Sequence, residues 1–135
     1  MSATDKTRRL TTNAILLSLA LILAIVERWI PLELIVPVPG IKLGLANIVS
    51  LFALVRLRWT DALAILVMRC LIIGTFTGLT AFLFSITGGL LALVIMGFLV
   101  RWEGKVFSLI GISLAGAAAH NLGQVSVAVL LLGEW

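Results

Sequence analysis

The sequence has few charged side chains for its length. Only 12% of its 135 residues are charged, and 61% are apolar even without its 12 glycines. Soluble domains have about 25% charged and about 45–50% apolar residues with glycine included. A chain this short has too little interior to hide so many aliphatic side chains from water, which excludes a soluble enzyme. Apolar, Leu-rich segments with few charges also exclude intrinsic disorder, so a membrane protein remains.

Cysteine is nearly absent, and the basic residues are scattered. The single cysteine, Cys70, excludes a disulfide within the chain and a cysteine metal site. The net charge of +4 does not predict a nucleic-acid partner, because the basic residues stand in ones and twos between apolar runs and form no basic stripe. The first apolar run is about 18 residues long and lacks an A-x-A-like cleavage site, so we expect a retained span and not a signal peptide.

The apolar runs predict five membrane-spanning helices, since crossing the hydrocarbon core takes about 17–25 helical residues. The second is short and follows a Pro-Val-Pro-Gly turn at residues 37–40, which cannot continue a helix. The predicted spans are residues 12–30, 41–55, 61–76, 82–100 and 106–132. The expected fold is therefore an all-α polytopic membrane helix bundle, with one integral membrane domain over residues 1–135.

Lysine and arginine positions predict a cytoplasmic N-terminus and an external C-terminus. In this orientation seven of the ten basic residues lie on the cytoplasmic side, two lie outside and one lies at membrane depth. The seven are Lys6, Arg8, Arg9, Arg56, Arg58, Arg101 and Lys105; the two are Arg28 and Lys42. Tryptophan at four predicted span ends agrees with this topology, because the ring prefers the headgroup region.

Arg69 is the basic residue at membrane depth. Facing lipid there would cost about 2.5–3.5 kcal/mol, so its side chain should face the protein interior. One interpretation is a cationic anchor for an anionic group of a ligand. The other is a structural partner of carbonyl groups or of a buried carboxylate, although the sequence offers no carboxylate within a span at similar depth. Both interpretations stay open.

Three polar side chains gather in the last predicted span. His120 and Gln124 are four residues apart and share one helix face, and Asn121 lies beside them. Hydrogen bonds between helices average only about 0.6 kcal/mol, and three groups exceed what joining two helices requires, so we favour ligand contact. The site lacks ligands for a metal. It also lacks a nucleophile paired with His120, so no catalytic residue is expected.

A third candidate follows the Pro-Val-Pro-Gly turn. Lys42 would lie in the first turn of a helix, and Asn47 deeper, where free backbone N–H groups favour anions. Lys42 can equally extend to lipid phosphate. Elsewhere, we expect Gly74, Gly78, Gly88 and Gly89 to loosen the connection between the third and fourth spans. The candidate substrate-binding residues are Lys42, Asn47, Arg69, His120, Asn121 and Gln124.

Three runs carry a family resemblance that covers nearly the whole chain: residues 39–49 (PGIKLGLANIV), 82–90 (FLFSITGGL) and 119–124 (AHNLGQ). They resemble the family called heptaprenyl diphosphate synthase component I, or Gx transporter family. In size, hydropathy and small-residue first helix, this family is similar to the substrate-binding S components of energy-coupling-factor (ECF) transporters. The resemblance implies a bacterial inner-membrane protein that captures a small polar or anionic ligand near its outer face and needs no cofactor of its own.

The resemblance also implies partners. S components work with a membrane coupling subunit and two ABC-type ATPases that hydrolyse ATP, and their first helix docks through an Ala-x-x-x-Ala face, which Ala20 and Ala24 match. The family label implies an alternative, a non-catalytic membrane subunit beside a soluble prenyl diphosphate synthase. Such synthases hold magnesium on Asp-rich motifs, whereas this chain has only Asp5 and Asp61, unclustered. Family members continue into a sixth span, so we expect either a truncated sequence or a member without its last helix.

Overall fold

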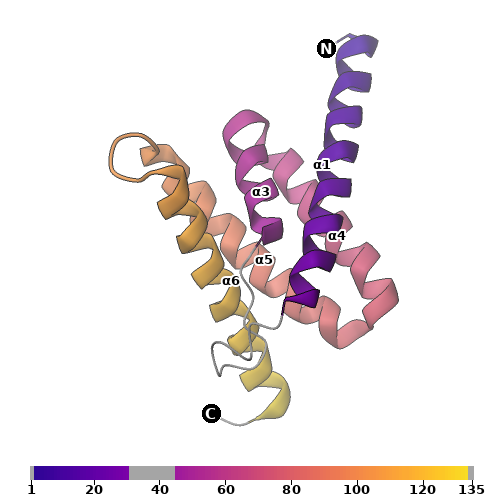
Figure 1. Cartoon of the computed structure of the whole chain (residues 1–135), viewed down its shortest axis with the longest axis vertical. Coiled ribbons are helices and arrows are strands. Elements are labelled where there is room, and N and C mark those ends of the chain that lie inside the picture. The colour runs from indigo at the N-terminus through magenta and orange to yellow at the C-terminus, as the bar shows by residue number, and fades with distance from the viewer. Residues whose placement is uncertain (1, 31–44, 134–135) are drawn as a thin grey trace.

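The computed structural model describes residues 2–30 and 45–133. In this part the chain forms α1 (Ala3–Trp29), α3 (Leu45–Arg56), α4 (Trp59–Thr77), α5 (Leu79–Leu99), the 3₁₀ turn η1 (Val100–Trp102) and α6 (Leu109–Leu132). The helices run up and down beside one another (Figure 1). The N-terminus, the α3–α4 turn and the connection from α5 to α6 lie at one end, which we call the N-terminal end. The predicted all-α helix bundle is confirmed.

Helix length separates α3 from the others. Four helices of the described chain are long and apolar enough to cross a membrane: α1, α4, α5 with η1, and α6. The 12 residues of α3 reach about 18 Å, against a hydrocarbon core of about 30 Å. Four predicted spans are therefore confirmed as candidate membrane helices. The second is a shorter apolar helix, and residues 41–44 of that prediction lie outside the described residues.

Two helices begin at positions set by polar caps. In α1, Ser2 Oγ accepts from the Asp5 backbone N–H at 3.2 Å, and the Ser2 backbone N–H donates to Asp5 Oδ2 at 3.4 Å. This capping box starts α1 at Ala3, well before the predicted residue 12. In α6, the side chain of Ser108 accepts from the Gly111 N–H at 3.1 Å and starts the helix at Leu109. Hydropathy marks apolar runs and not caps, which explains both shifts.

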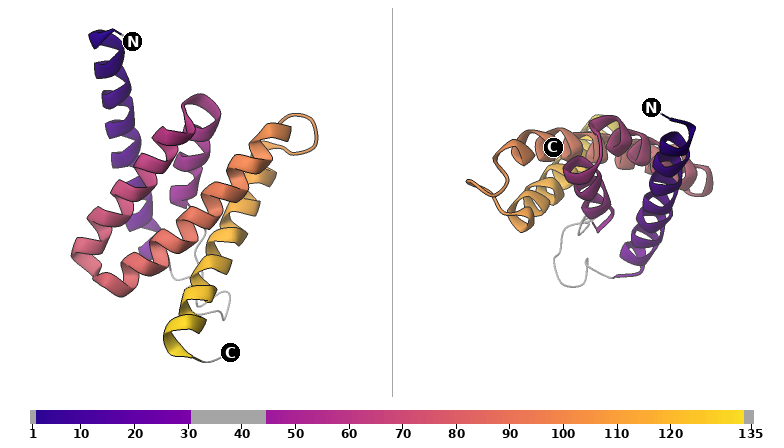
Figure 2. Two further views of the ribbon diagram at one scale, coloured as in Figure 1. Left: turned by 180° about the vertical axis from the view of Figure 1, so that it is seen from behind. Right: turned by 90° about the horizontal axis from the view of Figure 1, so that it is seen from above.

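The short α3 lies at the centre of the bundle (Figure 2). It contributes Val49 and Ala53 to a buried cluster with α1 and α4, and Leu51 to a second cluster with α5 and α6. Ala20 of α1 belongs to the first cluster and is only 1% exposed. Large aliphatic side chains cover the outer faces of the long helices, as expected where those faces meet lipid and not water. The chain is thus a multi-pass membrane protein.

The most extensive packing joins α5 to α6. A Cβ atom on Gly123 would lie 2.8 Å from Gly88 Cα, and a Cβ atom on Gly88 would lie 2.7 Å from the carbonyl oxygen of His120. Neither position leaves room for a side chain. Small residues let membrane helices approach closely, and here they bring the backbone of α5 against the polar face of α6.

Candidate functional site

Buried polar side chains on α3, α4 and α6 form a group that we call the buried polar layer. Asn47 lies nine residues before the end of α3, Arg69 ten residues after the start of α4, and His120 eleven residues after the start of α6. At about 1.5 Å per residue, all three lie about 14–17 Å from helix ends at the N-terminal end. Arg69 is 6% exposed, and Asn47, His120 and Gln124 are also buried. The expectation that Arg69 faces the protein interior is confirmed.

Two glycines of α5 bring three members of this layer together. A Cβ atom on Gly88 would lie 3.1 Å from His120 Cδ2 and 3.2 Å from Gln124 Cγ, and one on Gly89 would lie 3.3 Å from Arg69 Nη2. Arg69 of α4 and the two side chains of α6 therefore flank the same turn of α5. The expectation that Gly88 and Gly89 loosen a connection is wrong, because both are buried within α5.

Three polar atoms of the layer have no hydrogen-bond partner in the part of the chain that the structure describes. They are Asn47 Nδ2, Arg69 Nη2 and Gln124 Oε1. A buried donor or acceptor left unsatisfied costs about 1–3 kcal/mol, and more when it is charged. The layer thus presents two donors, one of them cationic, and one acceptor. A molecule with an anionic or carbonyl group and a hydrogen-bond donor has the complementary chemistry.

The expectation that no carboxylate lies near Arg69 is wrong, because Glu27 lies near it. Glu27 is buried and close enough to Arg69 for an electrostatic interaction. A depth counted along the sequence assumes parallel helices, whereas α4 crosses α1 at an angle (Figures 1 and 2). The carboxylate balances part of the charge on Arg69. It does not supply a hydrogen bond to Nη2, which is without one among the described residues.

The remaining predicted residues occupy different places. Asn121 is half-buried beside His120 on α6. Lys42 lies outside the described residues. Ala20 packs inside the chain's own core, and Ala24, one turn further along α1, is half-buried. The Ala-x-x-x-Ala face of α1 is therefore partly covered by this chain.

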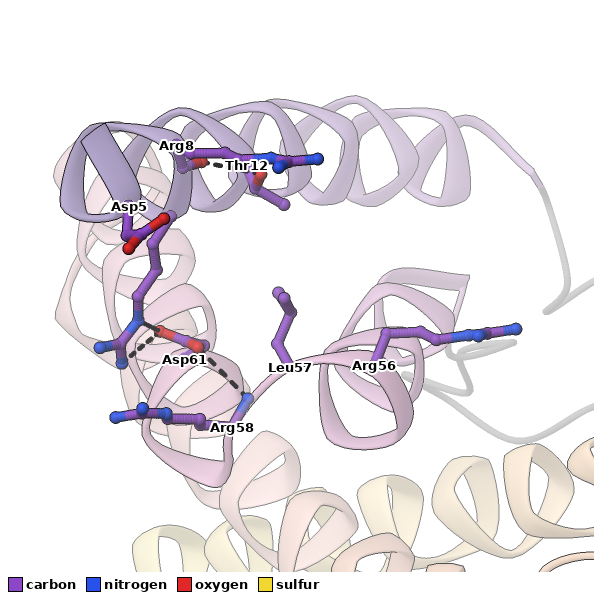
Figure 3. A pocket seen from close by; sticks show the side chains of 8 residues that line it. Asp5, Arg8, Thr12, Arg56, Leu57, Arg58 and Asp61 are labelled. Atoms are coloured by element: carbon purple, nitrogen blue, oxygen red, sulfur yellow. Dashed lines mark hydrogen bonds and ion pairs between the residues drawn. The ribbon is translucent and has the colours of Figure 1, made fainter. Parts of the chain in front are cut away.

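A second polar feature, which we call the arginine groove, lies at the N-terminal end (Figure 3). It is an open groove of about 390 Å³ between α1 and the α3–α4 turn. Its lining is Asp5, Arg8, Arg9, Thr12, Arg56, Leu57, Arg58 and Asp61. The groove was not predicted from the sequence, where these arginines indicated only the orientation of the chain. The sequence signal that could have indicated the groove is a pair of arginines before the first apolar run, Arg8 and Arg9, and a pair after the second run, Arg56 and Arg58.

Asp61 joins the two walls of the arginine groove. Its Oδ1 atom accepts from Arg9 Nε at 2.8 Å and from Asn13 Nδ2 at 2.9 Å, and lies 2.7 Å from Arg9 Nη2. Its Oδ2 atom accepts from the backbone N–H of Arg58 at 3.2 Å. Arg9 Nη2 also donates to Thr60 Oγ1 at 3.2 Å. We call this network the Arg9–Asp61 clasp, since it ties α1 to the start of α4.

Comparison with known proteins identifies the family of the chain. No curated protein and no solved structure matches it. The model of the family described as heptaprenyl diphosphate synthase component I matches residues 16–135. This match includes the whole buried polar layer, whereas the α1 wall of the arginine groove precedes it. The chain belongs to the heptaprenyl diphosphate synthase component I family.

Proposed function

We propose that the chain is the substrate-binding membrane subunit of an ECF-type micronutrient importer. The observation that carries this proposal is the buried polar layer, with Asn47 Nδ2, Arg69 Nη2 and Gln124 Oε1 unsatisfied among the described residues. Ionisable groups within membrane helices are costly and mark ligand or ion sites. A small ligand would accept hydrogen bonds from Arg69 and Asn47 through an anionic or carbonyl group, and donate one to Gln124.

The proposed transport direction requires a cytoplasmic N-terminus. The fold supports this orientation, because the segments that carry the seven basic residues lie together at the N-terminal end (Figure 1), and basic residues concentrate on the cytoplasmic side. A reporter that works only in the cytoplasm should therefore be active when it is fused after Arg58 or Lys105. A reporter that works only outside the cytoplasm should be inactive at the same positions. Activity of an external reporter after Arg58 would contradict the orientation.

ATP hydrolysis in this proposal belongs to two ABC-type ATPases, joined to the chain through a membrane coupling subunit. The chain itself binds the substrate and has no catalytic residue. The first helix would dock on the coupling subunit. Because Ala20 is covered by α3 and α4, we place that contact at Ala24 and the exposed surface beside it.

A second candidate function is a non-catalytic membrane component of a prenyl diphosphate synthase, with a soluble synthase subunit as its partner. Two observations favour it. The family description names a component of such a synthase, and four arginines are among the residues that line the groove at the N-terminal end. Under the proposed orientation this groove faces the cytoplasm, where a soluble subunit would reach it.

The decisive variant is Arg69→Gln in the full-length protein, purified in mild detergent from its native membranes. We expect the small molecule retained by the wild type, detected by native mass spectrometry, to bind about 1.5–3 kcal/mol more weakly, the scale of a hydrogen bond to a charged group. Arg69→Lys should restore only part of this loss, because an ammonium cannot reproduce the planar fork of a guanidinium.

The control variant is Arg101→Gln, which removes an exposed arginine outside the layer. It should leave both ligand retention and thermal stability unchanged. If Arg69→Gln lowers the unfolding temperature equally with and without the retained molecule, Arg69 is a structural partner of Glu27 and the site loses its centre. The same preparation separates the two functions, because co-purifying ATPases and a coupling subunit support the importer, and a soluble prenyl synthase supports the alternative.

A further inference from the structure

The buried charges beside the polar layer are paired. Arg69 is 6% exposed and Glu27 is 8% exposed, and the two side chains interact electrostatically. Asp61 is the other buried charged residue of the described chain, and Arg9 engages it in the clasp at the N-terminal end. The charge on Arg69 therefore has a buried carboxylate beside it that belongs to the chain itself.

The guanidinium group of Arg69 still has a donor without an acceptor. Its Nη2 atom has no hydrogen-bond partner among the described residues, although Glu27 balances the charge of the group. This atom lies beside the backbone of α5, since a Cβ atom on Gly89 would be 3.3 Å away from it. The layer thus presents a donor that needs an acceptor but no further negative charge.

The balance of charge determines which acceptor suits this donor. A second carboxylate beside Arg69 and Glu27 would place two negative charges around one positive charge in an interior of low dielectric constant, where an uncompensated charge is expensive. An uncharged carbonyl oxygen accepts the same hydrogen bond and leaves the balance unchanged. His120 does not alter this count at pH 7, where an imidazole is mostly neutral. Glu33 and Lys42, which lie outside the described residues, have opposite charges and cancel in the sum.

We propose that the buried polar layer binds an uncharged carbonyl compound, such as an amide or a lactam, and that Glu27 excludes carboxylates from it. Glu27 determines this specificity through Arg69, because its carboxylate supplies the negative charge that an anionic ligand would otherwise bring. The inference rests on the proposed function, since it concerns the substrate class of the same site. It narrows the group that Arg69 binds from an anion or a carbonyl to a carbonyl alone.

The test measures the binding of two probes of matched shape, acetamide and acetate, to the full-length protein in detergent by saturation-transfer NMR. Dialysis first removes any retained small molecule, and empty micelles at the same ionic strength give the background. The wild type should bind acetamide at least about tenfold more tightly than acetate, an effect comparable with one hydrogen bond to a charged group.

The variant is Glu27→Gln, which removes the carboxylate and keeps the size of the side chain. It leaves Arg69 without its buried counter-charge, so acetate should bind at least about tenfold more tightly than it binds to the wild type, and acetamide should change little. The matched control is Glu103→Gln, the same change at an exposed residue outside the layer, which should leave the binding of both probes unchanged.

Four results would overturn the inference. Acetate binding to the wild type at least as tightly as acetamide means that the layer takes an anion, and the importer proposal then stands with an anionic substrate. An unchanged ratio of the two affinities in Glu27→Gln means that Glu27 is only structural, and an equal gain of acetate binding in Glu103→Gln means that only the diffuse field of the protein changed.

The fourth result is that neither probe binds above the background of empty micelles. Arg69 Nη2 then takes up no carbonyl oxygen, whereas the molecule retained by the wild type still tests the importer proposal separately. If Glu27→Gln unfolds in detergent, the ratio of the two affinities on the wild type decides the substrate class.

Discussion

Replacing Asp61 by asparagine should lower the free energy of unfolding by about 3 kcal/mol. Removing one partner of a buried ion pair costs about 3–5 kcal/mol, because the other charge is left uncompensated. Asp61 is 3% exposed, whereas the side chain of Arg9 is 33% exposed and keeps some contact with water. The cost therefore falls at the lower end of this range. Unfolding of the full-length protein by a denaturing detergent measures it.

The matched control for this prediction is Asp5→Asn. It makes the same chemical change in the same groove, but at an exposed residue whose role is to cap α1, so the expected loss is about 0.5–1 kcal/mol. The double variant with Arg9→Gln and Asp61→Asn should lose at least about 1 kcal/mol less than the sum of the single variants, since the two residues share one interaction. Equal losses from Asp5→Asn and Asp61→Asn would show that the clasp does not hold α1 to α4.

Replacing Gly123 by alanine should separate α5 from α6. The new Cβ atom would lie 2.8 Å from Gly88 Cα and 3.1 Å from both Gly88 N and the carbonyl oxygen of Thr87. All three are backbone atoms, so no side-chain rotation relieves the contact. We expect a loss of about 3 kcal/mol in the free energy of unfolding, at the upper end of the range for overpacking.

Gly111→Ala is the control on the same helix. Its Cβ atom would meet only Ser108 Oγ, at 3.4 Å, and alanine favours helix over glycine by up to about 1 kcal/mol. This variant should therefore be neutral or slightly stabilising. A similar loss at Gly111 and Gly123 would mean that the close approach of α5 and α6 is not what holds this half of the bundle together.

Hydropathy and charge predicted the approximate places of the helices in residues 2–30 and 45–133, and the burial of Arg69. Both follow from local properties, since an apolar run must be helical in lipid and a charge within it must face inward. The start of α1 at Ala3 was not predicted, because it depends on the Ser2 cap and not on hydropathy. The nearness of Glu27 to Arg69 was missed because it depends on the angle between α1 and α4, which no single run of sequence encodes.

The candidate sites also divide into residues that local sequence identifies and features that depend on how the helices pack. Asn47, Arg69, His120 and Gln124 were recognisable because each is expensive inside an apolar segment. The roles of Gly88 and Gly89 were not, because the close approach of α6 to Gly88 and of α4 to Gly89 depends on the fold. The arginine groove needed the fold itself, since Arg8 and Arg58 belong to segments that meet only when α1 packs beside the α3–α4 turn.

The Arg9–Asp61 clasp also orders the events of synthesis. Arg9 and Asp61 are 52 residues apart, and a ribosome adds about 5–20 residues per second. The first helix therefore waits several seconds in the membrane before its carboxylate partner has been made. During this interval α1 can contact lipid and α3, which precedes Asp61 in the chain and packs against α1. The polar tie between α1 and α4 can therefore form only after the start of α4 has been made.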